Sequence, residues 1–488
     1  MSTDGPVTRR AYARRRRGRA FIGAFTAVLG VLAVLGLAGA AVGSAQGPRV
    51  TAVHVDPVAA ASASGARLIV TMNQSLHTLK PEQVHITPAT PFTVDTSGRG
   101  MGVRFTLPLY DDTEYTVRFT DVTGLGGGPA ARVTQTFRTP ALAVYLLQRN
   151  PVGDSILRTD LTGSDPVPVL RADHIEDFRA TSGHLVVSTL AATGAARLIV
   201  TDLDGRHARD LPLPGRGTIA GLQTADRGEL IGYTFSDADL GRGGTRESRL
   251  YVASVKDAAA RTAPVAVDVP GTEKRVADWR FVPDSDSILV LTYDGRTLLS
   301  GATGADPTQL GTGAAIDGIA RGSSVAVIQR TTEIVAIDLS DGTESDLVTA
   351  TADGRAVPGH LGQVIPIPGT TGASVRPYTV LDVAGGSGGG QGVPDGTTVF
   401  RVDDDGAATP LLRLPPSDAL LQTCISPSGR YAALTIAPET VTNTYDDYLM
   451  PMPTTVRTRI VQLADGAPVH TFSGFGISWC QVPPPLSQ

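Results

Sequence analysis

The sequence has few of the residues on which most catalytic and metal sites depend. Two Cys and two Trp occur among 488 residues, aromatic residues make up 5%, and only Lys80, Lys256 and Lys274 are lysines. No G-x-S-x-G, H-E-x-x-H, C-x-x-C or phosphate-loop motif is present. The eight His are scattered and no two stand at metal-ligand spacing. We therefore expect no catalytic residues, no metal and no cofactor.

The charge is distributed unevenly along the chain. Residues 1–45 hold seven of the 42 basic residues and a single acid, so residues 46–488 carry 35 basic and 46 acidic residues. Nucleic-acid binding requires cations that displace counterions from phosphates, and an acidic bulk does not supply them. We expect no nucleic-acid partner.

The amino terminus has the pattern of a membrane anchor. Seven Arg within residues 1–19 precede residues 20–47, which carry no charge. As a helix, residues 20–42 would be about 35 Å long, enough for a hydrocarbon core of ~30 Å. Arginines beside an apolar run stay inside. We predict a cytoplasmic tail over 1–19, a transmembrane helix or uncleaved signal anchor in the lipid bilayer over 20–45, and all later domains extracellular.

A cleaved signal peptide is the alternative to an anchor. Gly43-Ser44-Ala45 has the small-x-small form that a signal peptidase accepts. The apolar run is longer than the ~7–15 residues of a typical signal-peptide core, which favours the anchor. Both interpretations place residues 46–488 outside the cytoplasm.

Residues 46–139 are predicted to form a β-sandwich. About seven short alternating runs occur there, the number expected for seven strands in ~100 residues. The segments LYDDTEYTV (109–117), DVTG (121–124) and FRT (137–139) resemble the bacterial Ig-like domain of SbsA-type surface-layer proteins. In that family these are packing and turn positions, so the resemblance implies a spacer or presentation module.

Residues 140–488 show a loose repeat of short strands that predicts a β-propeller. One unit runs through DFRA (177–180), HLVVSTL (184–190), ARLIVTDLDG (196–205) and ARDLPL (208–213), and five others follow. Residues 143–171 offer only three strands, and GISWC (476–480) stands alone at the end. Together they complete a seventh blade, which closes the ring and removes its open edges. The predicted fold is an all-β ectodomain with a seven-bladed propeller.

Two segments of this repeat carry a family likeness. ISPSGRYAAL (425–434) and FVPDSDSILVL (281–291) resemble TolB-like and WD-like propeller repeats. The resemblance implies a fold with interaction surfaces, in which the repeat residues themselves serve as turn and core positions.

The two cysteines occupy matching positions in neighbouring blades. Cys424 lies three residues before Pro427, and Cys480 three before Pro483. Because disulfides persist outside the cytoplasm, we predict a Cys424–Cys480 bond, with two free buried thiols as the alternative.

Two aspartate-rich segments are predicted to be turns. Asp202-Leu203-Asp204-Gly205 and Asp403-Asp404-Asp405-Gly406 lack the Glu that completes a calcium loop. Asp-Gly favours a type I′ hairpin turn.

Three insertions interrupt the repeats and are predicted to share one face of the ring, at 235–248, 383–397 and 437–456. The third is chemically the richest, and Tyr and Met are favoured at interfaces. Its candidate binding residues are Tyr445, Asp446, Asp447, Tyr448, Met450 and Met452. A plain flexible loop is the alternative.

These observations favour a non-enzymatic cell-envelope protein that displays a propeller outside the membrane to bind a protein or polymer. The alternative is an exported propeller hydrolase or lyase acting on envelope polysaccharide. That alternative is weakened by the scarcity of aromatic residues, which usually hold sugar rings.

Overall fold

The computed structural model describes residues 23–36, 47–191, 193–225, 230–256, 262–302, 304, 307–382 and 393–484. Residues 23–36 are helical. Within the described ranges no helix combines the length and the apolar character that a membrane crossing requires. The predicted tail over 1–19, part of the predicted span over 20–45 and the possible cleavage site at Ala45 lie outside these ranges, so the anchor stays a prediction.

Residues 50–138 form two antiparallel sheets that pack face to face. One sheet has the order β1-β2-β5-β4 and the other β3-β6-β7. The elements are β1 (Val50–Val55), α2 (Pro57–Ser62), β2 (Arg67–Met72), η1 (Pro81–Gln83), β3 (Val84–Thr87), β4 (Phe92–Ser97), β5 (Gly100–Phe105), β6 (Glu114–Val122) and β7 (Ala131–Arg138). The short helix α2 was not expected, and it begins where the Asp56 carboxylate accepts the Val58 and Ala59 N–H groups.

The core of this sandwich follows from the alternation of its strands. In β6, Tyr115, Val117 and Phe119 point inward and are at most 1% exposed. The Tyr115 hydroxyl accepts the Tyr110 N–H at 2.9 Å, which fixes the segment before the strand. The motif that suggested an Ig-like domain thus supplies packing, while its family assignment stays a prediction.

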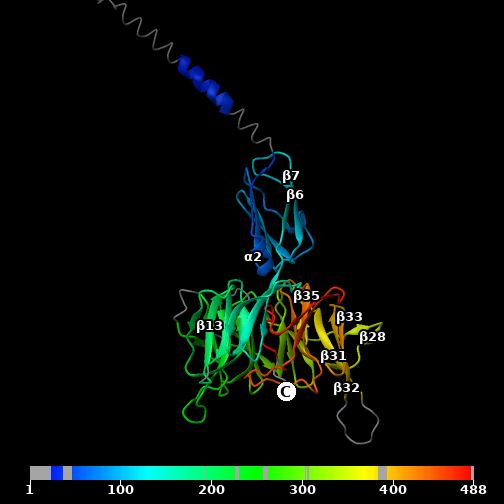
Figure 1. Ribbon diagram of the computed structural model, residues 1–488. Helices are drawn as coiled ribbons and strands as arrows, with labels where there is room; N and C mark the ends of the chain where they lie inside the picture. The colour runs from blue at the N-terminus through cyan, green and yellow to red at the C-terminus, as the bar shows by residue number, and fades with distance from the viewer. Residues whose placement is uncertain are drawn as a thin grey trace, which may run out of the picture.

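Residues 143–473 form seven successive sheets arranged as a ring, in the part of the chain that the structure describes (Figure 1). The predicted propeller is confirmed by this arrangement, and we number the sheets blades 1 to 7. Blades 1 to 3 contain β8 (Ala143–Gln148), β9 (Asp154–Asp160) and β10 (Val167–Ala172); β11 (Ile175–Ala180), β12 (His184–Leu190), β13 (Ala196–Asp202) and β14 (Arg209–Leu211); and β15 (Gly217–Thr224), β16 (Leu230–Asp237), β17 (Arg249–Ser254) and β18 (Val265–Ala266).

Blades 4 to 7 continue the ring. Their strands are β19 (Val276–Phe281), β20 (Ser287–Thr292), β21 (Arg296–Gly301) and β22 (Thr308–Thr312); β23 (Ala315–Ile319), β24 (Val325–Gln329), β25 (Ile334–Asp338) and β26 (Glu344–Asp346); β29 (His360–Leu361), β30 (Ile365–Pro366), β31 (Ser374–Asp382), β32 (Val393–Val402) and β33 (Ala408–Leu414); and β34 (Ala419–Ile425), β35 (Tyr431–Ala437), β36 (Arg457–Gln462) and β37 (Pro468–Ser473). A hairpin of β27 (Thr351–Ala352) and β28 (Arg355–Ala356) stands between blades 5 and 6.

The carboxyl end of the chain closes the ring against its first blade. Leu147 and Phe475 exchange backbone hydrogen bonds of 2.9 and 3.0 Å, and the Ser478 N–H donates to the Tyr145 carbonyl at 3.0 Å. Residues 474–480 therefore occupy the innermost position of blade 1, as predicted. The predicted disulfide is also confirmed: Cys480 is bonded to Cys424 on β34, with their Cα atoms 5.3 Å apart.

The two Asp-Gly segments are hairpin turns, but not of the predicted type I′. Gly205 (φ 81°) and Gly406 (φ 89°) adopt the left-handed conformation, whereas the aspartates before them do not. The Asp202 N–H donates to the Arg206 carbonyl and the Asp403 N–H to the Ala407 carbonyl, so each loop spans three residues. A loop of this length combines a right-handed turn with one left-handed glycine.

The sandwich rests on one face of the ring (Figure 1). The face is built from the connections between the first and second strands of blades 4 to 7. Arg430 donates to the Asp111 carbonyl at 3.0 Å, and Ser64 donates to Asp284 at 3.1 Å. Leu107 is 5% exposed and packs on Gly369, where a Cβ would lie 2.5 Å from its Cδ1 atom. Glycine is required there by close approach as well as by its φ of 75°.

Candidate functional site

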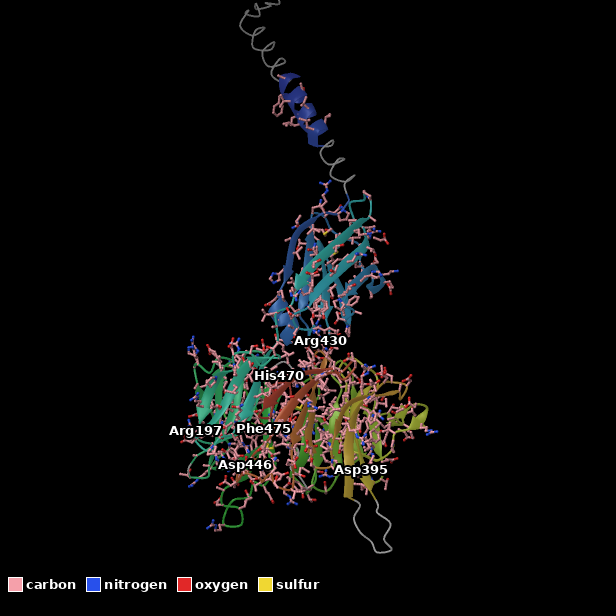
Figure 2. All side chains as sticks on the ribbon, turned by 45° about the vertical axis from the view of Figure 1, so that its right-hand side comes forward. Arg197, Asp395, Arg430, Asp446, His470 and Phe475 are labelled. Atoms are coloured by element: carbon pink, nitrogen blue, oxygen red, sulfur yellow. A yellow bond between two sulfur atoms is a disulfide. The ribbon has the colours of Figure 1, made fainter. Side chains whose placement is uncertain are left out.

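The six predicted contact residues lie in the β35–β36 connection, on the face of the ring opposite the sandwich. Asp446 lies at that far side, whereas Arg430 lies beneath the sandwich (Figure 2). Tyr445 and Asp447 are exposed, while Asp446, Tyr448 and Met450 are partly buried. Met452 is only 4% exposed and belongs to the core shared by blades 1, 2 and 7. The structure therefore does not present the six residues as one surface.

Tyr448 is held between two side chains of blades 1 and 2. The Tyr448 ring stacks on His174, with ring centroids 3.8 Å apart. The guanidinium carbon of Arg149, the residue after β8, lies 3.7 Å from the centroid of the Tyr448 ring. The phenol donates to Asp154 at 2.9 Å. Burial, followed by the contact with Asp154, raises the pKa of Tyr448. A ring stacked against both a cation and an imidazole is a fixed anchor.

The backbone of the same connection is also fixed. The Leu449 and Met450 N–H groups both donate to the Glu176 carboxylate at 3.1 Å. Arg149 donates to Asp446 at 2.8 Å, and the two side chains are only 8% and 15% exposed. The connection thus fastens blade 7 to blades 1 and 2, which is a structural role for four of the six residues.

An axial channel passes through the ring, and paired charges line it on blades 2 and 4. Asp177 accepts from Arg179 at 2.8 Å on β11, and Asp278 pairs with Arg280 on β19. Arg280 also donates to the Ile316 carbonyl at 2.7 Å in the next blade. The pair on blade 4 therefore joins its inner strand to that of blade 5, whereas Asp177 and Arg179 bond to each other and to the backbone of Phe178 and Gln481.

Asp317 on β23 holds blades 5 and 6 together from within the same channel. It accepts the Val364 N–H at 3.0 Å and the Gln329 amide at 2.8 Å, and it is 3% exposed. Burial raises the pKa of Asp317 to about 7. A small cavity of about 80 Å³ lies between Asp317 and the disulfide.

The carboxyl-terminal segment 481–484 runs into this channel after leaving blade 1. Arg179 donates to the Gln481 carbonyl at 3.2 Å, and Gln422 donates to the Val482 carbonyl at 2.8 Å. Gln481 and Val482 line the small cavity beside Asp317, while Pro483 and Pro484 line another of about 100 Å³ near Glu176. The segment therefore occupies the axis of the ring.

A cavity of about 650 Å³ lies between the sandwich and the propeller. Its wall combines α2, the linker from Pro140 to Ala143 and the mouth of the channel. The side chains most relevant to binding are Val58, Leu142, Tyr145, Arg158, Leu203 and Trp479. We call it the junction cavity. Pockets of 300–1,000 Å³ with mostly apolar walls and a few polar groups are typical of ligand sites.

Trp479 is the principal aromatic group of the junction cavity. It is 7% exposed, and its ring is stacked on Tyr431 with centroids 6.5 Å apart. Its indole Nε1 is buried without a hydrogen-bond partner in the described structure. A buried indole N–H usually has a partner, so Trp479 departs from the usual pattern, and because Nε1 is buried it is the ring rather than the N–H that contributes to the wall.

Sequence reasoning did not find the junction cavity. Its wall comes from the sandwich, the linker and blades 1, 2, 3, 5 and 7, so no local motif marks it. The axial Asp–Arg pairs could have been found from the sequence, because D-F-R (177–179) and D-W-R (278–280) stand at the same place in two repeats. Trp279 and Trp479 are both buried, but only Trp479 lines the junction cavity.

The described residues contain no group of three or more His, Cys, Asp or Glu side chains placed to hold a metal ion. What the junction cavity offers is a mixed apolar and polar wall. That arrangement is suited to binding.

No family model matches this sequence, and no curated protein matches it. Among solved structures, a putative TolB from Agrobacterium tumefaciens is 17% identical with a TM-score of 0.35, over 58% of this chain and 91% of that one. A putative 6-phosphogluconolactonase from Bacteroides fragilis is 12% identical with a TM-score of 0.41, over 69% and 96%. The β-propeller domain of Cps50 (Swd1) from Myceliophteria thermophila is 11% identical with a TM-score of 0.39, over 62% and 87%. Likenesses of this size do not bear on function.

Proposed function

We propose that this chain is a non-enzymatic cell-envelope protein that binds a segment of an extracellular protein or polymer in its junction cavity. Residues 20–45 anchor it in the membrane, residues 1–19 remain inside, and the sandwich holds the propeller outside. The observation that carries the proposal is the cavity of about 650 Å³ whose wall is shared by the two domains.

The chemistry of the wall supports a binding role. Leu142, Leu203 and Val58 offer apolar area, Trp479 adds an aromatic side chain, and Arg158 adds a charged group. Gln481, the first residue of the segment 481–484, also lines the cavity, on the side that faces the axis of the ring. Apolar walls with a few convergent polar groups supply affinity and orientation together.

The alternative function, an exported hydrolase or lyase of polysaccharide, has one supporting observation. Asp202 and Asp204 both line the junction cavity, and glycoside hydrolysis uses paired carboxylates. However, the hydrogen bond from His207 lowers the pKa of Asp202. A general acid needs a raised pKa, so this pair is poorly suited to protonate a leaving group.

The test is affinity capture with the full chain, using a variant that obstructs the cavity. Ser182 is exposed and lines the cavity, so Ser182→Trp adds bulk there without disturbing the core. Val152→Trp is the matched control, because Val152 is 96% exposed and does not line the cavity. We expect wild type and Val152→Trp to retain the same envelope protein or polymer, and Ser182→Trp to lose it.

Two further results decide between the alternatives. Retention by Ser182→Trp at the wild-type level contradicts the cavity as the site. Conversion of the captured polymer to shorter fragments by the purified chain favours the hydrolase or lyase. A Tyr445→Ala/Asp447→Ala variant tests the predicted loop surface, since these two side chains remain exposed.

A further inference from the structure

The outer face of the β3-β6-β7 sheet carries a group of cations and hydroxyls with no acid among them. The alternation of β6 turns Arg118 and Thr120 outward while Phe119 lies in the core. The strand register places His85 opposite Arg118, and Arg118 opposite Thr134. With Arg132 these side chains line a concavity of about 560 Å³. We call these five residues the basic face.

The basic face lacks the counter-charges found elsewhere in the molecule. Neither Arg118 nor Arg132 forms an ion pair with a described residue, although many arginines of the propeller do. His85 and Arg118 stand directly opposite across two strands, an arrangement that is unfavourable whenever both are charged. The Thr120 hydroxyl donates to the Gln83 carbonyl at 3.2 Å. An anionic ligand would relieve the repulsion.

Three acids of the domain, Glu114, Asp121 and Glu82, lie on or beside the same strands. Glu114 points outward on the same strand but four residues from Arg118, roughly 14 Å along the strand. It is opposite Arg138, which is itself bonded to Asp112 at 2.9 Å. Asp121 and Glu82 flank Thr120 and Gln83 in the sequence, and no ion pair joins them to Arg118 or Arg132 in the described structure.

The position of the basic face in the domain points to the source of the anion. The strand β7 ends at Arg138 beside the linker to the propeller, so its start near Arg132 lies at the opposite end of the sandwich. The chain enters the sandwich at that end (Figure 1), where Gly47 packs against Pro129. If residues 20–45 cross the bilayer, this is the end nearest the lipid headgroups.

The charge of the two domains restricts the ligand further. Residues 47–139 contain eight basic and seven acidic residues, whereas residues 140–488 contain 27 basic and 39 acidic. The net charge of −12 on the propeller repels a phosphate-bearing ligand, whereas the net charge of +1 on the sandwich does not. Guanidinium groups bind phosphate oxygens in a bidentate manner, and hydroxyls complete the shell of donors.

We propose that the basic face binds the phosphodiester of an anionic phospholipid headgroup, which holds the sandwich against the bilayer. The inference rests on the proposed membrane anchor for the source of the phosphate, and on the contacts above for the site itself. Arg118 and Arg132 bind the phosphate, with His85, Thr120 and Thr134 around them.

The site is tested first with a soluble probe, so that the result does not depend on the anchor. Glycerophosphoglycerol, the headgroup of phosphatidylglycerol, is titrated against the full chain in neutral detergent, and binding is followed by its ³¹P line width. Arg118→Gln/Arg132→Gln should weaken binding about 30-fold, roughly fivefold for each arginine. The matched control is Arg67→Gln/Arg104→Gln, an exposed cross-strand arginine pair on the other sheet of the sandwich. It should bind as wild type does.

The bilayer is tested with the full chain in nanodiscs that contain photoreactive phosphatidylglycerol. Crosslinks should map to residues 84–87 and 114–138 in wild type and in the control, and should be lost in Arg118→Gln/Arg132→Gln. Equal binding of the soluble probe by all three proteins, or no binding by wild type, overturns the site. Binding of the probe without crosslinks at these strands overturns the lipid as its source.

Discussion

At the scale of single residues, the polar side chains inside the ring serve chiefly to join neighbouring blades. Asp317 bonds to a backbone N–H of blade 6, and Arg280 bonds to a backbone carbonyl of blade 5. Such contacts satisfy groups that the ring takes out of water, where an unpaired partner would cost about 1–3 kcal/mol. A change in the protonation of a carboxylate such as Asp317 should therefore change the free energy of unfolding.

Asp317 provides a prediction for pH. Burial raises its pKa from 3.8 to about 7, so between those values the folded chain retains a proton that the unfolded chain releases. The stability that this group contributes is complete below about pH 4 and is lost as the pH rises to 7. Asp317→Asn does not titrate, so its free energy of unfolding relative to wild type should rise across this window, by at most about 4 kcal/mol.

The measurement for Asp317 is urea unfolding at several pH values between 4 and 8. Asp346→Asn, a change at an exposed position of β26, is the control and should show no such trend. A constant difference between Asp317→Asn and wild type from pH 4 to 8 would contradict the prediction.

Among the elements, the carboxyl-terminal segment is the one that closes the ring. Residues 474–480 add the innermost strand to blade 1, and the disulfide ties their end to β34 of blade 7. The segment 481–484 then enters the channel, where Arg179 and Gln422 bind its carbonyls. Closure of the ring therefore depends on a few residues far from their partners in the sequence.

The disulfide should contribute a large part of the stability of this closure. It joins residues separated by 56 positions, and restricting the unfolded chain over such a loop is worth roughly 4 kcal/mol. Cys424→Ser/Cys480→Ser should lower the free energy of unfolding in urea by about that amount. Reductant should destabilise wild type similarly and leave the double variant unchanged. An unfolding transition of wild type that reductant does not move would show that the bond contributes nothing.

At the scale of the whole molecule, the junction between the two domains creates the cavity on which the proposed function rests. Arg430 makes a polar contact between the two domains. It donates to the Asp111 carbonyl at 3.0 Å, and its guanidinium carbon lies 5.4 Å from the Tyr110 ring and 5.2 Å from the Tyr431 ring. One side chain thus links the sandwich to blade 7, next to the floor of the cavity.

Arg430→Ala should loosen the junction without unfolding either domain. We expect a broader distribution of distances between spin labels on the sandwich and on the ring, and weaker retention of the partner by the junction cavity. Arg413→Ala, on the exposed side of β33, is the control and should change neither quantity. Unchanged distances in Arg430→Ala would mean that Leu107 and the linker suffice to fix the domains.

The predicted contact loop shows where sequence reasoning stopped. Tyr448 was chosen because Tyr is favoured at interfaces, and Asp446 because it lies in the same insertion. The structure uses both at an interface within the chain, with His174 and Arg149. Composition does not distinguish an intramolecular partner from an external one. The predicted role in external binding stays a prediction for the exposed Tyr445 and Asp447.

The β architecture, the closed propeller and the Cys424–Cys480 bond could be predicted from the amino-acid sequence, because strand alternation, repeats and matching positions are local or periodic signals. The junction cavity, the axial Asp–Arg pairs and the basic face became visible only in the folded molecule. Each of these brings together side chains from strands that are distant in the sequence, and their distances are fixed by how the sheets pack.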